Sequence, residues 1–252
     1  MCRLGFLPKS VQLTTRHHAP ARCRAMFSRM PNTPFTIFQR LYRAYGPQDW
    51  WPARSRFEVM VGAILTQNTS WTNVETALKH IKREKCLESQ KLAMMSHARL
   101  AQLLKPVGYF NVKATRLQSF CRWYNAQGQY KQLNKQETEM LREALLAVHG
   151  VGPETADDIL LYAFERDVFV IDAYTRRMFS RLGLLDGHEP YEVMRGWFEA
   201  KLKRQDNKVA LFNEFHALIV HHAKYICRAR KPACTDCCLR QQCNFYKVNG
   251  GA

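Results

Sequence analysis

Residues 145–163 read LLAVHGVGPETADDILLYA, and apolar residues recur at helical spacing on both sides of the central turn, residues 149–153. Gly150 and Gly152 permit backbone angles that are closed to other residues, and they let the main chain approach a partner closely. Pro153 suits the first position of a helix, where its missing N–H costs nothing. The stretch therefore predicts a hairpin between two helices. Its exposed N–H groups favour a phosphate anion, although a plain helix-capping turn would use the same residues.

Helical periodicity extends outward from this hairpin, from Pro34 nearly to the end of the chain. No run alternates with period two, and no segment repeats at solenoid spacing. A core-facing helix is predicted from an apolar stripe that consists of Phe57, Met60, Val61, Ile64 and Leu65. A second helix follows the polar turn 66–70, with Thr72 and Glu75 spaced as a capping box. The pattern predicts an all-α fold.

The composition is that of an ordinary globular chain, with 46% hydrophobic and 23% charged residues among 252. Collagen-like, fibrous and disordered classes are thereby excluded. Lys and Arg number 38 against 21 Asp and Glu, and a surface with a net charge of +17 attracts polyanions. No apolar run approaches the roughly 18 residues that a membrane span needs. Nucleic acid is therefore the expected partner, and no membrane partner is expected.

One acidic residue stands out because of where it lies. Asp172 follows the short apolar run 168–171 and precedes another helical pattern. Asp is among the residues preferred as a helix N-cap. The same carboxylate, partly enclosed by the apolar run and Tyr174, also suits stabilisation of a cation or activation of water. The two roles are compatible, and the residues alone leave both open.

Four of the nine cysteines crowd together near the C-terminus, with the spacing C-x6-C-x2-C-x5-C. They are Cys227, Cys234, Cys237 and Cys243. This crowding in a large chain favours a metal site in a reducing compartment over a disulfide framework. Zinc sites usually have two close pairs of ligands, whereas a single all-Cys loop suits a four-iron cluster. A [4Fe-4S] cluster is therefore the expected cofactor, with zinc as the alternative.

The hairpin, the acidic residue after VFVI and the four-Cys spacing together resemble the helix-hairpin-helix (HhH-GPD) DNA glycosylases of the endonuclease III superfamily. The likeness covers roughly residues 35–246. It implies a base excision repair enzyme with two helical lobes and a DNA-binding cleft. It also implies that Gly150, Val151 and Gly152 bind a DNA phosphate, that Asp172 is catalytic, and that the four cysteines bind the [4Fe-4S] cluster.

The sequence departs from the bifunctional endonuclease III branch at one position. Glu154 stands where that branch carries a Schiff-base lysine. A carboxylate cannot form an imine, so the resemblance implies a monofunctional glycosylase that uses water as the nucleophile. Glu154 is either a catalytic residue or an acidic residue favoured in the first turn of a helix. A lysine elsewhere could still substitute.

Within the superfamily, the segments GVGPETADDILLYA, DWWP and LTQNTSW are most similar to the 3-methyladenine DNA glycosylase III branch. That branch surrounds a flipped alkylated purine with aromatic residues, and Trp50, Trp51 and Trp71 match those positions. An alkylated purine carries positive charge, which favours indole faces. Trp51 and Trp71 also suit an ordinary core.

The polar turn between the first two helices resembles the superfamily's loop that fills the gap left by an extruded nucleotide. Gln67 and Asn68 are the matching residues, and their amides can hydrogen-bond an unpaired base without a charge to desolvate. Local capping of the following helix is the alternative.

These features predict three parts of the chain. Residues 1–30 form a basic extension, which is a disordered arm, an organellar address or a stretch upstream of the true start. Residues 56–166 form a six-helix bundle with the hairpin, and residues 31–55 and 167–252 form a second lobe with Asp172 and the cysteine loop. We expect a monomer that binds double-stranded DNA containing a damaged base. Its expected location is the cytoplasm with the nucleoid, if bacterial.

Removal of alkylated purines by hydrolysis is the expected activity, and two alternatives remain. The first is an endonuclease III-like glycosylase and AP lyase for oxidised or mismatched pyrimidines. The second is a non-catalytic iron-sulfur protein that only binds DNA. Glu154 argues against the first alternative and Asp172 against the second.

Overall fold

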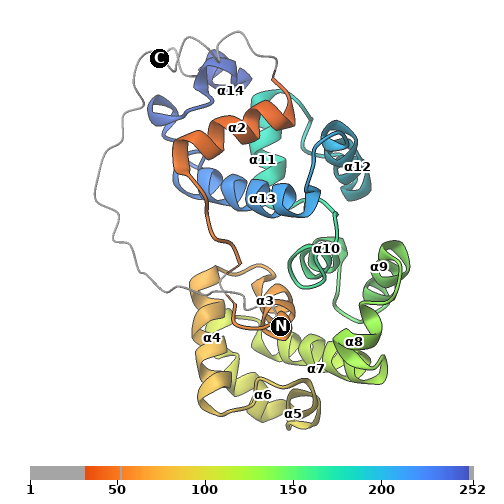
Figure 1. The fold of residues 1–252 in the computed structure, drawn as a ribbon. Helices are drawn as coiled ribbons and strands as arrows, with labels where there is room; N and C mark the ends of the chain where they lie inside the picture. Colours follow the sequence, from red (N-terminus) through yellow and green to blue (C-terminus); the bar gives the residue numbers. More distant parts are fainter. Residues whose placement is uncertain (1–31, 52, 250–252) are drawn as a thin grey trace. The chain divides into compact units, whose positions relative to one another are not determined.

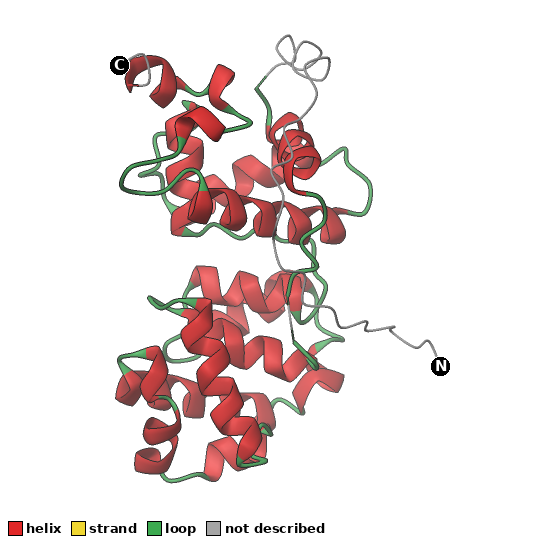
Figure 2. Ribbon diagram, turned by 90° about the vertical axis from the view of Figure 1, so that its left-hand side faces the viewer, coloured by secondary structure: helices red, strands yellow, loops and turns green. Residues whose placement is uncertain are grey.

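The computed structural model describes residues 32–51 and 53–249, so the predicted extension, residues 1–30, lies outside the described part of the chain. Among the described residues the regular elements are α-helices and short 3-10 helices, without a strand, which confirms the all-α fold (Figure 2). The elements are α2 (Pro34–Tyr45), α3 (Arg56–Thr66), α4 (Trp71–Arg83), α5 (Ser89–Met94), α6 (His97–Leu103), η1 (Lys105–Val107), α7 (Phe110–Ala126), α8 (Gln129–Leu133), α9 (Thr138–Leu146), α10 (Pro153–Tyr162), α11 (Ala173–Leu182), α12 (Tyr191–Leu202), α13 (Lys208–Tyr225), η2 (Cys234–Asp236), η3 (Arg240–Gln242) and α14 (Asn244–Asn249).

The helices pack in two groups within one compact unit that begins at Asn32 (Figure 1). In the first group, α3 packs against α4, α7 and α10, while α7 packs against α5 and α6. In the second group, α13 packs against α2 and α11, while α2 also packs against α12. Because α10 belongs to the first group and contacts α13 of the second, it joins the two groups directly after the hairpin.

The segment 56–166 contains more helices than the six that the sequence predicts. Its described elements run from α3 to α10 with η1 among them. The additional helices are short, since α5 has six residues and α8 has five. A helix of this length has too few apolar positions to produce a periodic pattern, which explains the error.

The predicted stripe of α3 does face the core. Met60, Val61, Ile64 and Leu65 are fully buried, and Phe57 packs against them from the edge. Ser55 is the N-cap of the helix, and its hydroxyl accepts the N–H of Glu58 at 3.2 Å. Burial of this stripe supplies most of the free energy that holds α3 in place.

The predicted capping box of the second helix is wrong. Thr72 and Glu75 lie inside α4, which begins at Trp71. Its N-cap is Ser70, whose hydroxyl accepts the N–H of Asn73 at 3.4 Å. Ser is also a preferred N-cap. Because Ser70 lies two residues before Thr72, the polar turn ends at Ser70.

Stacked phenylalanines anchor the apolar run that precedes Asp172. Phe169 stacks on Phe198 of α12, with ring centroids 4.2 Å apart, and meets Phe215 of α13 edge-on at 5.7 Å. All four residues of the run 168–171 are buried. Aromatic pairs in such geometries add to the free energy gained from burial alone. The run is therefore a firm support for the residue that follows it.

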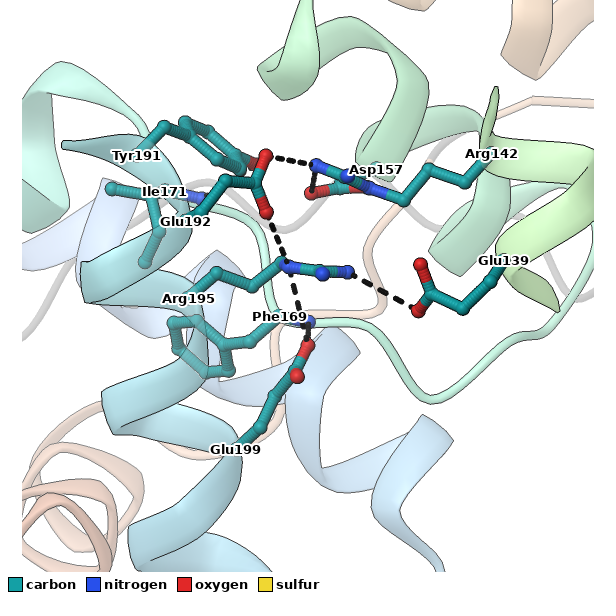
Figure 3. Close-up of polar contacts among 9 residues, drawn as sticks. All are labelled: Glu139, Arg142, Asp157, Phe169, Ile171, Tyr191, Glu192, Arg195 and Glu199. Carbon is teal, nitrogen blue, oxygen red and sulfur yellow. Dashed lines mark hydrogen bonds and ion pairs between the residues drawn. The ribbon is translucent and has the colours of Figure 1, made fainter. Parts of the chain in front are cut away.

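An ion-pair network connects three helices beside this run (Figure 3). Arg142 of α9 donates to Asp157 of α10 at 2.7 and 3.2 Å and to Glu192 of α12 at 2.7 Å. The Arg142 and Asp157 side chains are 8% and 0% exposed. Arg195 of α12 extends the network, with Nε 3.2 Å from Glu192. The network therefore crosses from one helix group to the other.

Side chains of α12 also hydrogen-bond to the backbone of the apolar run 168–171 (Figure 3). Glu199 accepts the N–H of Phe169 at 3.1 Å, and the Tyr191 hydroxyl accepts the N–H of Ile171 at 3.3 Å. Buried backbone N–H groups outside helices need such partners. These bonds fix the main chain immediately before Asp172.

None of the described helices is long and apolar enough to cross a membrane.

Candidate active site

Asp172 is the N-cap of α11, as its position after the apolar run predicts. Its Oδ1 accepts the backbone N–H of Thr175 at 2.7 Å and the Thr175 hydroxyl at 2.8 Å. The side chain is 11% exposed, so most of the carboxylate is enclosed but it is not sealed inside the protein. Capping uses Oδ1 and leaves Oδ2 available for other partners.

Oδ2 of Asp172 faces His216, a residue of α13 that the sequence does not single out. The Nε2 of His216 lies 3.6 Å from Oδ2, and its Nδ1 lies 2.6 Å from the hydroxyl of Tyr162 on α10. Burial opposes charge on both groups, but their mutual attraction and the bonds from Thr175 lower the pKa of Asp172. Attraction to Asp172 likewise raises the pKa of His216 against its burial. The two groups thus form a buried ion pair.

Two more carboxyls of α10 lie near this pair. Burial raises the pKa of Asp158 well above its ordinary value, and the charges of Glu154 and Asp172 act in the same direction. Glu154 occupies the first turn of α10 and is exposed along one side. Protein atoms around its carboxyl and repulsion from Asp172 nevertheless raise its pKa to about 7. Asp172 is thus the carboxyl of this site that gives up its proton most readily.

The three tryptophans predicted to surround a base lie together. Trp51 is 5.0 Å from Trp71 and 5.7 Å from Trp50 between ring centroids, with edge-on contacts. All three are half-buried, and none of their indole N–H groups has a hydrogen-bond partner among the described residues. The Trp51 ring also lies 5.1 Å from that of Tyr162, whose hydroxyl contacts His216. A chain of contacts therefore runs from the indoles to the carboxylate at the start of α11.

The predicted hairpin joins α9 to α10, and Pro153 occupies the first position of α10. Gly150 has a φ of +87°, and a Cβ there would lie 2.1 Å from Cγ of Arg116. Gly152 has an ordinary φ of −97° with open space around it, so the expectation of an angle closed to other residues is wrong for this glycine. The open space leaves its main chain accessible. Val151 is buried, so its side chain packs inward.

From the sequence, Gln67 is expected to fill the gap left by an extruded nucleotide, but its side chain is hydrogen-bonded to the hairpin. Its Nε2 donates to the Gly150 carbonyl at 2.9 Å and to the Thr155 hydroxyl at 3.0 Å. Its Oε1 accepts from Arg116. Both ends of the amide are engaged, so Gln67 positions the glycine turn, and contact with an unpaired base requires exchange of these bonds.

Gln67 and Asn68 line a surface cavity with an empty volume of about 590 Å³. Asn68 has a φ of +53°, and Tyr109, at the start of α7, is 77% exposed beside it. The other lining residues are Val112, Lys113 and Arg116. Sequence reasoning missed Tyr109 and Arg116, because an aromatic residue after a glycine and an arginine on a helix are common on ordinary surfaces.

All four cysteines of the predicted metal site line one hollow. Their thiols are free. The Sγ of Cys227 lies 3.4 Å from Nη1 of Arg181, and the Sγ of Cys237 accepts the N–H of Leu239 at 3.3 Å. Thiolates bound to a metal accept N–H groups directed at sulfur in this way.

The donor set is all-Cys, as an iron-sulfur cluster requires. Among the described residues, no three His, Cys, Asp or Glu side chains gather closely enough to hold one metal ion. Four thiols around a hollow suit a larger group with all-Cys ligation.

The family model described as "HhH-GPD superfamily base excision DNA repair protein" matches residues 61–203. Two relatives agree with this match. The "Putative DNA repair glycosylase MJ1434" of Methanocaldococcus jannaschii is 43% identical over 212 residues, which cover 83% of this chain and 94% of the relative. An endonuclease III of Sulfolobus acidocaldarius is 29% identical over 199 residues, which cover 78% of this chain and 85% of the relative.

The structure is also similar to solved glycosylases. The H. pylori 3-methyladenine DNA glycosylase MagIII, bound to 1,N6-ethenoadenine, superposes with a TM-score of 0.68 at 28% identity, covering 76% of this chain and 97% of MagIII. A non-covalent endonuclease III–DNA complex gives a TM-score of 0.74 at 19% identity, covering 88% of this chain and 100% of that protein. The second likeness concerns the fold alone.

Proposed function

This chain belongs to the HhH-GPD superfamily of base excision DNA repair proteins and is a DNA glycosylase of that superfamily. On that premise, we propose that it removes alkylated purines of the 3-methyladenine type. Water breaks the N-glycosidic bond and the product is an abasic site in an intact strand. One observation carries the proposal, namely the group of three tryptophans that contacts Tyr162 next to the His216–Asp172 pair.

The tryptophan group suits a cationic base. N-alkylation leaves a purine with positive charge, which is attracted to the electron-rich face of an indole. The indole N–H groups of Trp50, Trp51 and Trp71 are buried and lack hydrogen-bond partners among the described residues. Such a base has a weakened glycosidic bond and needs little acid assistance. The likeness to MagIII, named as a 3-methyladenine glycosylase, supports the same substrate class.

Asp172 supplies the charge that the reaction needs. As the base departs, the sugar becomes positively charged, and a nearby carboxylate stabilises it most strongly where water is scarce. Asp172 is mostly enclosed and its pKa is lowered, so it is ionised at neutral pH. The same carboxylate orients or deprotonates the attacking water.

Glu154 supports a monofunctional reaction. It stands at the helix position expected for a Schiff-base lysine, and a carboxylate cannot form an imine with the sugar. Lys113, which lines the cavity beside Gln67, is only 2% exposed and donates to the carbonyls of Leu65 and Val107. Its ammonium is therefore engaged in two hydrogen bonds.

Double-stranded DNA that contains a damaged base is the proposed partner, bound by a monomer. The N-terminal end of α10, preceded by the accessible main chain of Gly152, suits a phosphate. The net charge of +17 adds a long-range attraction. The exposed ring of Tyr109 and the neighbouring Asn68 suit the gap left by a flipped nucleotide. Solved endonuclease III complexes with DNA share this fold.

Cys227, Cys234, Cys237 and Cys243 are the residues that would hold a [4Fe-4S] cluster. When bound, the cluster supplies a fold-stabilising crosslink, and no redox turnover is needed for hydrolysis. Around it, Arg181 donates to the backbone carbonyls of Arg228 and Ala229 at 2.7 and 3.0 Å. The cysteine loop is thereby tied to α11, whose first residue follows Asp172.

The test is to identify the base that the protein releases. Duplexes carrying 3-methyladenine or other methylated purines, and separately duplexes carrying thymine glycol, are incubated with the full chain, and free bases are identified by mass spectrometry. We expect a methylated purine and an unbroken strand before alkali treatment. Nicked thymine-glycol duplex without release of methylated purines would instead establish the endonuclease III-like alternative. Binding without release of any base would establish the non-catalytic alternative.

The cluster is tested separately. Cys234→Ala should remove the brown colour and iron content of the purified protein and weaken duplex binding, because one ligand is lost. Cys238→Ala is the matched control, since Cys238 does not line the hollow. This variant should keep the brown colour. A colourless wild type containing zinc after anaerobic purification would contradict the proposed cofactor.

A further inference from the structure

His216 lies in the middle of α13 with both ring nitrogens facing side chains of the candidate active site. Nδ1 is 2.6 Å from the Tyr162 hydroxyl, and Nε2 is 3.6 Å from Oδ2 of Asp172. The residue is 5% exposed, and its Nε2 makes no hydrogen bond within the described chain. The contact with Asp172 is therefore electrostatic, without the short distance of a hydrogen bond.

The titratable groups around His216 are acidic or phenolic. From α10 come Glu154, Asp158 and Tyr162, and from the start of α11 comes Asp172. One carboxyl oxygen of Asp158 is buried without a hydrogen-bond partner in the described chain. Three carboxyls, of which Asp158 and Asp172 are buried and Glu154 is exposed, thus lie near one imidazole.

The other helices against α13 do not supply a competing contact to His216. Tyr45 of α2 lies 2.6 Å from the Nδ1 of His222 and stacks near His221, both closer to the end of α13. Arg176 of α11 acts on Glu154, and its guanidinium donates to the carbonyl of Glu189 at 2.7 Å. His216 is therefore the cation positioned to interact with Asp172 directly.

Crowded carboxyls in a buried region bind protons, because each negative charge disfavours the next. Without the attraction of His216, burial would favour the protonated form of Asp172, opposed by the two bonds from Thr175. A protonated Asp172 would neither stabilise a cationic sugar nor accept a proton from water. The imidazolium of His216 favours ionisation of Asp172 over ionisation of Glu154 or Asp158.

We propose that His216 is a positioning residue for base excision: its imidazolium keeps Asp172 the ionised carboxyl of the site and holds Oδ2 in place. This rests on the proposed catalytic role of Asp172. The Tyr162 hydroxyl fixes the ring from the other side, because it is the only partner of Nδ1 in the described chain. His216 itself does not contact the sugar.

Tyr162 also connects this pair to the proposed base pocket. Its ring lies 5.1 Å from Trp51, and its hydroxyl contacts His216. A base stacked on Trp51 thus lies two side chains from the imidazole that orients Asp172. The wall of the base pocket and the support of the catalytic carboxylate are therefore built from the same tyrosine.

The first test is a titration that needs no substrate. The side-chain carboxyl carbons of the aspartates are followed by NMR against pH in the wild type and in His216→Gln, with Asp172→Asn identifying the signal. Loss of the imidazolium should raise the pKa of Asp172 by at least about one unit, a tenfold change in its ionisation equilibrium. An unchanged titration of Asp172 would overturn the proposal, whether or not the enzyme excises methylated bases.

The second test is the pH profile of single-turnover excision from a methylated duplex. In His216→Gln the acid limb of the profile should move to higher pH by at least about one unit, and the rate should approach that of the wild type at pH values where Asp172 is again fully ionised. An equal loss at every pH would assign His216 a purely structural role. His80→Gln is the matched control, because His80 is half-buried on α4 and its Nδ1 lies 3.3 Å from the Leu103 carbonyl, away from Asp172.

A third variant covers the case in which His216→Gln does not fold. Tyr162→Phe keeps the ring beside Trp51 and removes only the hydroxyl that contacts Nδ1. It should raise the pKa of Asp172 less than His216→Gln and shift the excision profile in the same direction. A pH profile of excision identical to that of the wild type would show that the Tyr162 hydroxyl does not position His216. If the wild type releases no methylated base, the proposed substrate fails, while the NMR titration still decides the role of His216.

Discussion

At the scale of single residues, the carboxylate of Asp172 has two functions that can be separated by mutation. Oδ1 caps α11 through Thr175, and Oδ2 faces His216. In Asp172→Asn the cap is retained, because Asn caps a helix about as well as Asp, whereas the negative charge is lost. We expect base excision to fall by at least about a hundredfold while duplex affinity stays close to that of the wild type. Single-turnover kinetics and equilibrium binding measure the two effects, and normal turnover would remove Asp172 from the mechanism.

Glu154 should make folding stability depend on pH. Its pKa is raised to about 7 in the folded protein, above its value in the unfolded chain, so the folded state retains the proton at pH values where the unfolded state has lost it. The contribution of Glu154 to the free energy of unfolding therefore falls as pH rises from about 4.5 to 7 and stays low above that. Glu154→Gln removes this fall, so the variant should gain stability relative to the wild type at pH 8 but not at pH 4.

Urea unfolding at the two pH values measures this difference. Glu143→Gln is the matched control, because Glu143 is an exposed residue of the preceding helix, α9. The assignment of the shift to Glu154 would be refuted by the same relative change at both pH values.

At the scale of elements, the hairpin provides a comparison between two glycines. In Gly150→Ala the new Cβ meets Arg116 and the backbone is strained at a φ of +87°, which costs about 1–2 kcal/mol of stability. In Gly152→Ala the new Cβ lies in open space and φ is ordinary, so the stability of this variant should stay near that of the wild type. Thermal unfolding compares the two, and equal destabilisation would contradict the structure.

Duplex binding distinguishes the roles of the same two glycines. If the main chain at Gly152 approaches a phosphate closely, Gly152→Ala should weaken binding although the protein remains as stable as the wild type. Salt titration of the binding constant then shows whether a phosphate contact has been lost.

Helices with strong local signals could be predicted from the sequence. The stripe of α3, Pro153 at the start of α10 and Asp172 at the start of α11 depend on residues within about four positions of each other. The cap of α4 could not be decided, because Ser70 and Thr72 are both suitable caps and only the path of the chain selects one.

At the scale of the whole molecule, Arg142 connects helices of both groups. Removing this cation would leave the Asp157 carboxylate buried without its partner, at a cost of about 3–5 kcal/mol. We therefore expect Arg142→Met to unfold at a much lower urea concentration than the wild type. The double variant Arg142→Met/Asp157→Leu leaves no buried charge and should recover part of the loss. A double variant as unstable as the single one would show that the ion pair itself is not the cause.

Local patterns in the sequence by themselves determined the helical class, the glycine hairpin, the helix start at Asp172 and the four grouped cysteines. Each of these depends on spacing, capping or charge among residues close together along the chain. The family resemblance added roles for these residues, and the match of residues 61–203 to the HhH-GPD model agrees with the family.

Only the tertiary structure decided which side chains surround Asp172. Trp51, Tyr162 and His216 lie far apart in the sequence, and they reach one site because α10 packs against both α3 and α13. It also decided that Gln67 is bonded to Gly150, 83 residues away. The physical reason is that periodicity reports which face of a helix is buried, whereas the partner of that face depends on how helices remote in sequence pack together.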